Sequence, residues 1–354
     1  MPAKHGLFLG VDIGGTKVAA GIVTPLGEII SKVRVPMVSD RDSAAGLAAV
    51  ESAISAALES QPKRRSSVAA IGISCPGPLD PRRGVVINPP NLKCWRNFPL
   101  AEKITASRHL PARLDNDANA AALAEALWGA GAGYASVFYA TLGTGIGTGV
   151  ILDGRIYHGR TGAAAEGGHV SIDYRGPKCA CGKLGCIEAL GAGPAVARRA
   201  QEWLRSGVPG RENLLSLAGG KPEGVTAEMV GAAWHAGDKL SADVLRETAD
   251  LLAIWLGNIV DLFEPDVIIF GGGMGELMSE WFGRIREQLP AWTINSRCRE
   301  IPLVRARYGE DSGIAGAAAL CLGLRSSQAA SKVARSKIKP ARKPAPARKS
   351  KRKR

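Results

Sequence analysis

A short segment of the sequence, residues 166–188, contains three cysteines, one histidine and two glutamates. Glycines lie between the cysteines, and glycine permits the tight chain reversals that bring such side chains together. Thiolates and an imidazole suit zinc, and four of them complete its tetrahedron. We therefore predict a zinc site in this segment. The predicted ligands are His169, Cys179, Cys181 and Cys186.

A site with four protein ligands has no position for water, so the predicted metal is structural. Its role would be to hold the residues that flank it, which are Glu166 and Glu188. Carboxylates fixed beside an imidazole are good acceptors for sugar hydroxyls. The alternative is a set of reduced cysteines with His169 as a hydrogen-bonded loop residue, but the dense spacing favours the metal site.

Two glycine-rich turns are candidates for binding phosphate. The first follows an apolar run, residues 7–13, and precedes a second apolar run that ends at Val23. This pattern predicts a strand, a turn and a strand, with backbone N–H groups that can approach a phosphate closely. Asp12 is suited to hold a metal-bound water, although an ordinary hairpin with a solvated lysine explains the pattern nearly as well. The candidate residues are Asp12, Gly14, Gly15, Thr16 and Lys17.

The same arrangement recurs further along the chain. A predicted strand at residues 136–141 precedes a glycine-rich stretch, residues 142–149. Two such hairpins suggest an internal duplication, in which they face each other and clamp a polyphosphate. A third glycine run follows the predicted strand 267–270 and would let a purine lie against the backbone. The candidate residues in these two stretches are Gly143, Thr144, Gly145, Gly272 and Gly273.

Three polar residues, Asp115, Asn116 and Asp117, stand between a predicted strand at 112–114 and a strongly helical pattern. Asp and Asn are favoured helix N-caps, which is one interpretation. The other is that they point into a cleft at the carboxyl end of a strand, where α/β proteins place their chemistry. The proline-bearing loop around Asn91 is placed to close over a ligand.

Apolar periodicity positions these residues on an alternating set of strands and helices, which indicates an α/β fold. Further strands are predicted at residues 28–35 and 68–74, and Cys75 after the second is interpreted as a packing residue. Helices are predicted at residues 43–60, 189–206, 242–264 and 312–322, with another from the third glycine run to about residue 288.

The composition indicates a globular protein with a separate charged tail. The chain has 354 residues, 45% of them hydrophobic, which is enough for two domains. Of its basic residues, twelve lie in residues 326–354, which contain no acid, whereas residues 1–325 hold 34 basic and 32 acidic groups. The tail cannot bury a core, so we predict disorder there. No run reaches the ~20 apolar residues of a membrane span. An odd number of cysteines, three of them clustered, and no export signal predict a cytoplasmic protein.

Together these motifs resemble the ROK family of sugar kinases and sugar-sensing repressors. The matching stretches are DIGGTK at residues 12–17, DNDAN at 115–119, LGTGIGTG at 142–149, EGGH and CACGKLGCIE within 166–188, and IIFGGGMG at 268–275. The resemblance spans residues 6 to about 322 in family order. It implies the actin/hexokinase-like (ribonuclease H-like) α/β fold, in which two duplicated domains enclose a central cleft. We expect residues 1–116 with 311–325 to form the smaller domain, and residues 117–310 the larger.

The resemblance also implies an activity, the transfer of a phosphoryl group from ATP with Mg²⁺ to a sugar hydroxyl. Asp117 matches the second aspartate of the family's D-N-D motif and would be the general base. The segment 166–188 looks most like that of glucokinase members, so the expected substrate is glucose, phosphorylated at its 6-hydroxyl. The expected sugar contacts are Asn91, Asn116, Asp117, Glu166, His169 and Glu188, and the family's zinc ligands fall on the four residues named above.

Several alternatives remain. The substrate would otherwise be fructose or an N-acetylhexosamine, or the phosphoryl donor polyphosphate. A non-catalytic sugar-sensing regulator of the family would carry a helix-turn-helix module ahead of Asp12, where we see no room, and the presence of Asp117 favours catalysis. The basic tail departs from the family pattern and is either a solvated extension or an attachment to DNA or polyphosphate. We expect a homodimer or a higher homo-oligomer.

Overall fold

The structure is a computed structural model that describes residues 6–207 and 212–322, so the predicted basic tail lies outside the described residues. Two five-stranded sheets form its framework, in the orders β3-β2-β1-β4-β7 and β10-β9-β8-β11-β12. The strands of the first sheet are β1 (Leu7–Ile13), β2 (Lys17–Val23), β3 (Ile29–Pro36), β4 (Val68–Cys75) and β7 (Ala112–Asn116). Those of the second are β8 (Ser136–Leu142), β9 (Ile146–Leu152), β10 (Arg155–Ile156), β11 (Val267–Gly271) and β12 (Leu303–Arg305).

The two sheets have the same topology. In the first, β1 and β3 flank β2 antiparallel, while β1, β4 and β7 run parallel. In the second, β8 and β10 flank β9 antiparallel, while β8, β11 and β12 run parallel. This repetition confirms the predicted duplication and the α/β class. A short hairpin of β5 (Leu79–Asp80) and β6 (Val85–Val86) lies outside both sheets.

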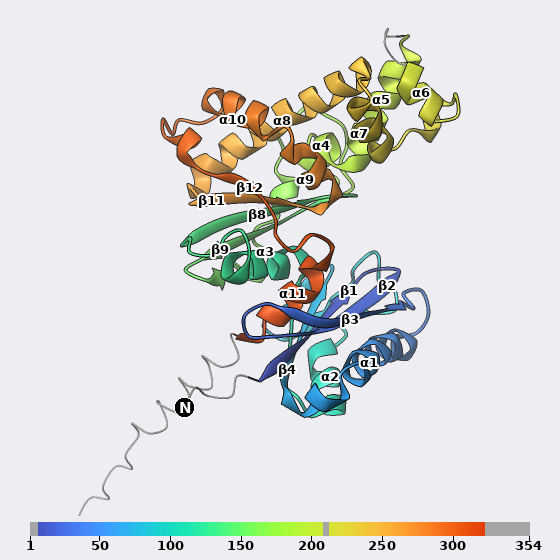
Figure 1. Ribbon diagram of the computed structural model, residues 1–354, viewed down its shortest axis with the longest axis vertical. Helices are drawn as coiled ribbons and strands as arrows, with labels where there is room; N and C mark the ends of the chain where they lie inside the picture. Colours follow the sequence, from blue (N-terminus) through green and yellow to red (C-terminus); the bar gives the residue numbers. More distant parts are fainter. Residues whose placement is uncertain (1–5, 208–211, 323–354) are drawn as a thin grey trace, which may run out of the picture.

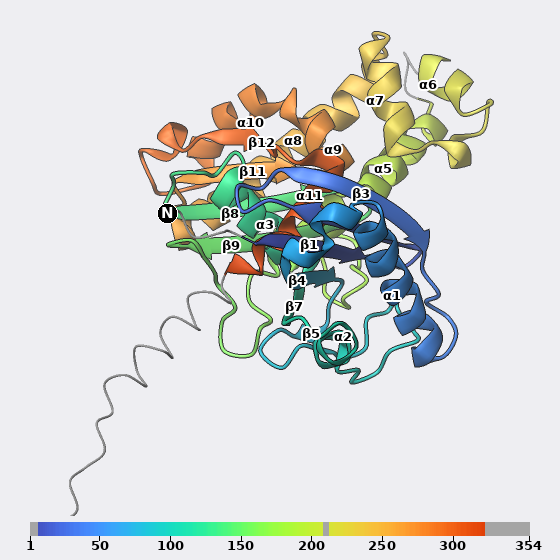
Figure 2. The ribbon, with the colours of Figure 1, turned by 60° about the horizontal axis from the view of Figure 1, so that its bottom comes forward.

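Helices cover both faces of each sheet (Figure 1). Helices α1 and α2 lie below the first sheet, α3 and α11 lie between the two sheets, and α8 to α10 lie above the second. Helices α6 and α7 lie at the far end of the second half (Figure 2). The helices are α1 (Ser43–Glu59), α2 (Leu100–Arg108), α3 (Asp117–Trp128), α4 (Ile187–Gly191), α5 (Gly193–Arg205), α6 (Glu212–Leu217), α7 (Ala227–His235), α8 (Lys239–Phe263), α9 (Gly272–Ser279), α10 (Phe282–Gln288) and α11 (Ser312–Ala319).

The central pair of helices, α3 and α11, joins the two halves of the molecule. Helix α11 packs on β1 and β4 so closely that a Cβ on Gly72 would lie 1.6 Å from the carbonyl oxygen of Ala317. Helix α3 packs on β8 and β9 of the second sheet. The two helices touch where a Cβ on Gly316 would lie 2.5 Å from the carbonyl carbon of Ala120. Small residues therefore allow the two sheets to approach through a single pair of helices.

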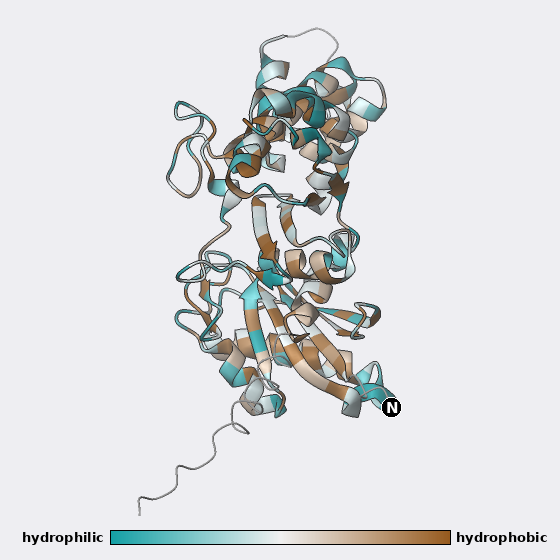
Figure 3. Ribbon diagram, turned by 90° about the vertical axis from the view of Figure 1, so that its left-hand side faces the viewer, coloured by the Kyte–Doolittle hydropathy of each residue, from teal (hydrophilic) through white to brown (hydrophobic). Residues whose placement is uncertain are grey.

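Each sheet has a separate apolar core on its outer face. The first lies between the sheet and α1, with Val50 and Ile54 fully buried. The second surrounds α8, where Trp255 packs edge-on against Phe138 of β8. Apolar residues follow the strands of the first sheet in Figure 3. Among the described residues, we find no helix long and apolar enough to cross a bilayer.

Most predicted elements are confirmed to within a few residues, and the differences at α4–α5 and at the start of α8 have local causes. The helix predicted at residues 189–206 is two helices, because Ala192 is extended and Gly193–Pro194 start a new helix. Helix α8 begins before residue 242 because the Asp238 side chain caps it, accepting a hydrogen bond from Ser241 N at 2.8 Å. The helix expected to reach residue 288 breaks into α9 and α10. Helix α11 ends at Ala319, short of residue 322.

Candidate functional site

Asp12 lies at the end of β1, beside the parallel strand β4. The hydroxyl of Ser74 on β4 donates to Asp12 Oδ1 at 2.8 Å. On the other side a Cβ on Gly313, in the first turn of α11, would lie 2.3 Å from Asp12 Cγ. The carboxyl is therefore held between the first sheet and the start of α11.

Asn116 and Asp117 occupy the junction of β7 and α3. The side-chain oxygen of Asn116 accepts hydrogen bonds from the N–H groups of Ala118 and Asn119, at 2.9 and 3.3 Å. The interpretation of Asn116 as a helix cap is thus confirmed. Asp117 is the first residue of the helix, and its Oδ1 accepts a hydrogen bond from Ala118 N at 2.8 Å. The residue is exposed to solvent. Helix capping by Asn116 is compatible with a position of Asp117 in a cleft, because the cap fixes the first turn of the helix that carries Asp117.

The segment predicted to bind zinc folds its four ligands together. The sulfurs of Cys181 and Cys186 lie 3.6 Å apart, and Cys179 Sγ lies 3.7 Å from His169 Nδ1. All four ligand atoms lie within 4.8 Å of one another, and none of the cysteines forms a disulfide. A regular tetrahedron with zinc–sulfur bonds of about 2.3 Å separates its sulfurs by about 3.8 Å. The residues therefore fit a tetrahedral zinc ion.

Glu188 connects this cysteine cluster to the second glycine turn. Its Oε2 accepts a hydrogen bond from Ile146 N at 3.0 Å, and its Oε1 lies 3.8 Å from His169 Nδ1. A Cβ on Gly145 would lie 2.7 Å from Glu188 Oε2, so glycine leaves room for this carboxylate. Because Nδ1 of His169 faces the sulfurs, its Nε2 remains for a different partner.

Glu166 precedes a short turn of 3₁₀ helix, Gly167–His169, that is fixed from two sides. Gly167 N donates to the hydroxyl of Thr148 on β9 at 2.7 Å, and its carbonyl accepts from the indole N–H of Trp255 at 3.0 Å. The sequence patterns did not point to Thr148 or Trp255, or to Ser74. Each is a buried residue of a strand or helix with one polar atom, which no local motif distinguishes.

The carboxyl groups influence one another. Burial raises the pKa of Asp117 above the usual range of aspartate. Burial also raises the pKa of Asp12, where the hydrogen bond from Ser74 opposes it and the charge of Asp117 adds to it. Burial raises the pKa of Glu166 too, where His169 opposes it and the charges of Asp117 and Glu188 add to it. The charge of Asp117 thus acts on a carboxyl beside the first turn and on one beside the predicted zinc site, and the residue is open to solvent.

The second and third glycine runs lie side by side at the end of β8. A Cβ on Gly272 would lie 2.4 Å from the carbonyl oxygen of Leu142, and the carbonyl of Gly143 accepts from Gly193 N at 2.8 Å. A Cβ on Gly143 or Gly273 would meet no atom within 4 Å. These two backbone positions therefore leave space for another molecule. Thr144 is exposed at the tip of the turn.

The first glycine turn packs against the loop that holds Asn91. A Cβ on Gly15 would lie 3.1 Å from the carbonyl oxygen of Asn91, and Gly14 N donates to Lys17 O at 2.9 Å. Thr16, Lys17 and Asn91 are all exposed. The structure therefore places Asn91 next to the first turn, with its side chain available to solvent.

Comparison with known proteins agrees with this arrangement. The family model described as "ROK family" matches residues 8–323, nearly all of the described chain. The chain belongs to the ROK family.

Relatives in the ROK family differ in function. The glucokinase of Streptomyces coelicolor is 35% identical over 89% of this chain and 97% of its own length. A solved ROK family glucokinase from Streptomyces griseus, in complex with glucose and AMPPNP, is 35% identical, with a TM-score of 0.75 over 89% of this chain and 99% of that one. A solved ROK family transcriptional regulator, a homologue of the E. coli MLC protein, has a TM-score of 0.81 at 26% identity, over 93% of this chain and 81% of that one. An N-acetylmannosamine kinase of Yersinia pseudotuberculosis is 29% identical over 88% of this chain and 97% of its own length.

These ROK structures confirm the actin/hexokinase-like fold predicted from the sequence. The relatives include kinases and a regulator, so family membership alone does not assign a reaction to this chain.

Proposed function

We propose that this chain is an ATP-dependent hexose kinase that phosphorylates the 6-hydroxyl of glucose. The observation that carries the proposal is the position of Asp117, an exposed residue at the start of α3 whose charge acts on both Asp12 and Glu166 and whose pKa burial raises. A carboxylate with a raised pKa is a stronger base than an ordinary aspartate. The named activities of the Streptomyces relatives support glucose and ATP as substrates.

In the proposed reaction, the 6-hydroxyl oxygen attacks the γ-phosphorus while Asp117 accepts the hydroxyl proton. The bond from that phosphorus to the β–γ bridging oxygen breaks, and ADP leaves. Most of the acceleration would come from positioning and from charge neutralisation, as is usual for phosphoryl transfer. Mg²⁺ bound with ATP would neutralise phosphate charge, and we propose that Asp12 would hold one of its water molecules.

The proposed sugar contacts use the segment that the zinc site would hold. The carboxylates of Glu166 and Glu188 would accept hydrogen bonds from sugar hydroxyls, and His169 Nε2 would bind a third. Zinc on the cysteine cluster would supply rigidity to this segment. The remaining proposed sugar contacts are Asn91 and Asn116.

The proposed nucleotide site uses the three glycine runs. Their open backbone would accept phosphates and the purine, and Lys17 would add a positive charge. The proposed contacts are Asp12, Gly14, Gly15, Thr16, Lys17, Gly143, Thr144, Gly145, Gly272 and Gly273.

We also propose the domain boundaries expected from the sequence, residues 1–116 with 311–325 and residues 117–310. The contacts of α11 with the first sheet and of α3 with the second support them. The proposed assembly is a homodimer or a higher oligomer, which light scattering of the purified protein would test.

Two other activities need to be tested against this proposal. The likeness to a transcriptional regulator favours a sugar-sensing protein without kinase activity. The match to an N-acetylmannosamine kinase favours an acetylated substrate. A kinase that takes fructose or that uses polyphosphate as donor is the remaining alternative.

The deciding experiment measures kcat/KM for glucose, fructose, N-acetylglucosamine and N-acetylmannosamine, each with ATP and with polyphosphate. We expect glucose with ATP to give the highest value. An acetylated sugar preferred by tenfold or more would replace glucose but retain the kinase. Sugar binding without turnover on any substrate would favour the regulator.

A further inference from the structure

A cavity of about 1050 Å³ lies between the two halves of the molecule, behind Asp117. Its lining includes Leu123 and Leu127 of α3 and Ala319 at the end of α11. Leu127 lies about 15 Å along α3 from Asp117, at 1.5 Å per residue. The cavity thus lies at the far ends of the same two helices whose first turns carry Asp117 and contact Asp12.

Cationic side chains from both halves line this interlobe cavity. Glu102 and Asp153 are acidic residues of the lining, while Asp115 is already paired with His158, whose Nε2 lies 2.6 Å from Asp115 Oδ2. The lining holds four arginines and three carboxylates, so positive charge is in excess. The arginines of the lining are Arg82, Arg83, Arg113 and Arg155. Arginine is the side chain best suited to bind phosphate through paired N–H groups.

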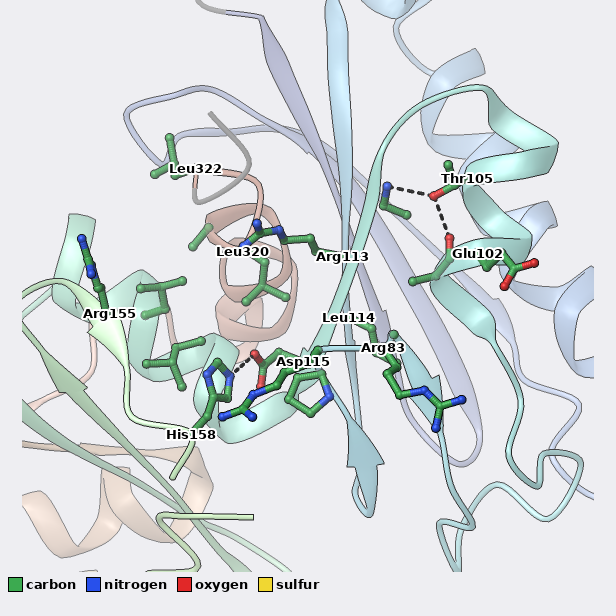
Figure 4. Close-up of a pocket in the computed structure, with 18 of the residues that line it drawn as sticks. Arg83, Glu102, Thr105, Arg113, Leu114, Asp115, Arg155, His158, Leu320 and Leu322 are labelled. Carbon is green, nitrogen blue, oxygen red and sulfur yellow. Dashed lines mark hydrogen bonds and ion pairs between the residues drawn. The ribbon is translucent and has the colours of Figure 1, made fainter. Parts of the chain in front are cut away.

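The rest of the lining is largely apolar, with Leu114, Ile156, Leu320 and Leu322 added to the two leucines of α3. Figure 4 shows Arg113 of β7 extending toward Leu320, and Arg155 of β10 on the opposite side of that residue. A ligand that fits must therefore combine an anionic group with an apolar body. The volume is large enough for a molecule of nucleotide size.

We propose that the interlobe cavity binds an organic phosphate. Its phosphate group contacts arginines that come from both halves of the chain, chiefly Arg113 and Arg155. Its apolar body lies against the leucines of α3 and against Leu320, which follows α11. This site is separate from the glycine runs and from the cysteine cluster, none of whose residues line the cavity.

Occupancy of this cavity also affects the site around Asp117. His158 belongs to the loop that leads to Glu166, and its partner Asp115 accepts a hydrogen bond from Asn119 Nδ2 at 3.2 Å, next to Asp117. A ligand that touches both halves favours one of their relative positions. In many enzymes such relative positions change when domains close on substrate. This effect on the site around Asp117 rests on the proposed function, whereas binding in the cavity does not.

The binding experiment uses 1-naphthyl phosphate as the probe in calorimetric titrations. The protein is saturated with Mg²⁺ and a non-hydrolysable ATP analogue, so that the proposed nucleotide site is occupied. We expect one saturable site per chain. We expect at least tenfold weaker binding of 1-naphthol, which lacks the charge, and of inorganic phosphate, which lacks the apolar body. Absence of saturable binding would overturn the proposal.

The variant R113M/R155M keeps the aliphatic stems and removes both charges, so we expect at least tenfold weaker binding of the probe. The matched control R41M/R64M removes two exposed charges outside the cavity and should bind as the unaltered protein does. Equal binding by R113M/R155M would overturn the site. If that variant does not fold, R155M alone gives the same test at an exposed residue of β10.

The kinase assay separates binding in the interlobe cavity from its effect on the site around Asp117. We expect saturating probe to change the KM for glucose at least threefold in the unaltered protein and not in R113M/R155M. Binding with an unchanged KM would overturn the coupling and leave the site. Binding by a protein that phosphorylates no sugar would overturn the proposed function and leave the site.

Discussion

The turns β1–β2 and β8–β9 occupy equivalent places in two sheets of identical topology, but their surroundings differ. The first turn exposes Thr16 and Lys17 and has Asp12 behind it. The second has no charged side chain of its own and rests on Glu188 and the start of α5. The duplicated framework therefore supplies two similar places for a ligand, and the chain packed behind each turn decides its chemistry.

The connection packed behind each turn differs greatly in length between the two halves. Between β3 and β4 lie residues 37–67, with the single α-helix α1, whereas residues 157–266 lie between β10 and β11. The longer connection brings Glu166, the cysteine cluster and Glu188 to the second turn. Under the proposed function, the second half would supply sugar recognition, while Asp117 at the start of α3 would serve both halves.

The most severe test of this comparison is Asp117→Asn, at the residue that both halves share. The substitution retains shape and hydrogen bonding but removes the base, so we expect kcat with glucose to fall by on the order of 10²–10⁴. Affinity for ATP should be retained. The matched control is Asp40→Asn, at an exposed aspartate. Turnover near that of the unaltered protein would leave Asp117 as a helix residue only.

Breaking the connection behind the second turn should have the next largest effect. Cys181→Ser removes one proposed zinc ligand, and loosening of Glu188 should raise the KM for the sugar about 10- to 100-fold, with ATP affinity unchanged. Elemental analysis should find about one zinc per chain in the unaltered protein, and less in the variant. Cys298→Ser, outside the cluster in the same half, is the control. Purified protein without zinc would contradict the prediction.

Two glycines of the second turn allow a finer test. Ala at residue 145 would press a Cβ against Glu188 Oε2, so Gly145→Ala should raise the KM for the sugar several-fold. Ala at residue 143 meets no protein atom within 4 Å and should affect the KM for ATP only. Steady-state kinetics of both variants, at unchanged melting temperature, makes the comparison. An identical effect of the two substitutions would show that the turn acts as one unit.

The pH dependence should reveal the shared environment of the carboxyl groups. Because burial raises the pKa of Asp117, the acidic limb of kcat/KM should lie above the pH range of an ordinary aspartate. A raised pKa also means that the ionised carboxyl opposes folding. The free energy of unfolding therefore falls as pH rises from the range of an ordinary aspartate through the raised pKa of Asp117. Asp117→Asn should therefore melt at a higher temperature than the unaltered protein at pH 7, and at a similar temperature at low pH. A lower melting temperature at pH 7 would contradict this.

Removal of the basic tail should have the smallest effect on catalysis. Truncation after Arg325 leaves every candidate site residue in place, so kcat/KM should change less than about twofold, within the usual effect of a remote surface change. If the tail binds DNA or polyphosphate, the full chain should bind these polymers with a steep salt dependence, because the contacts release counterions. Equal binding by the truncated chain would exclude the tail as their site.

Much of this framework could be predicted from the sequence, because apolar runs and glycine turns are local signals. The clustering of the four candidate zinc ligands was predicted for the same reason, since four compatible side chains lie in one segment. The residues that hold the site through hydrogen bonds could not be predicted. Ser74, Thr148 and Trp255 meet their partners only after the sheets form. The interlobe cavity was also missed, because its lining comes from both halves of the chain and shows no local pattern.

The position of α11 has a consequence for the synthesis of the protein. Phe8 and Ala70 on the inner face of the first sheet are fully covered only when α11 is present, and they pack against its Ile314. That sheet receives its last strand at Asn116, but α11 begins at Ser312. At translation rates of about 5–20 residues per second, the ribosome needs roughly 10–40 s to cover this interval. For that time the nascent chain holds a nearly complete sheet with one apolar face uncovered, which makes it a target for chaperones and, in chains that terminate early, a source of aggregation.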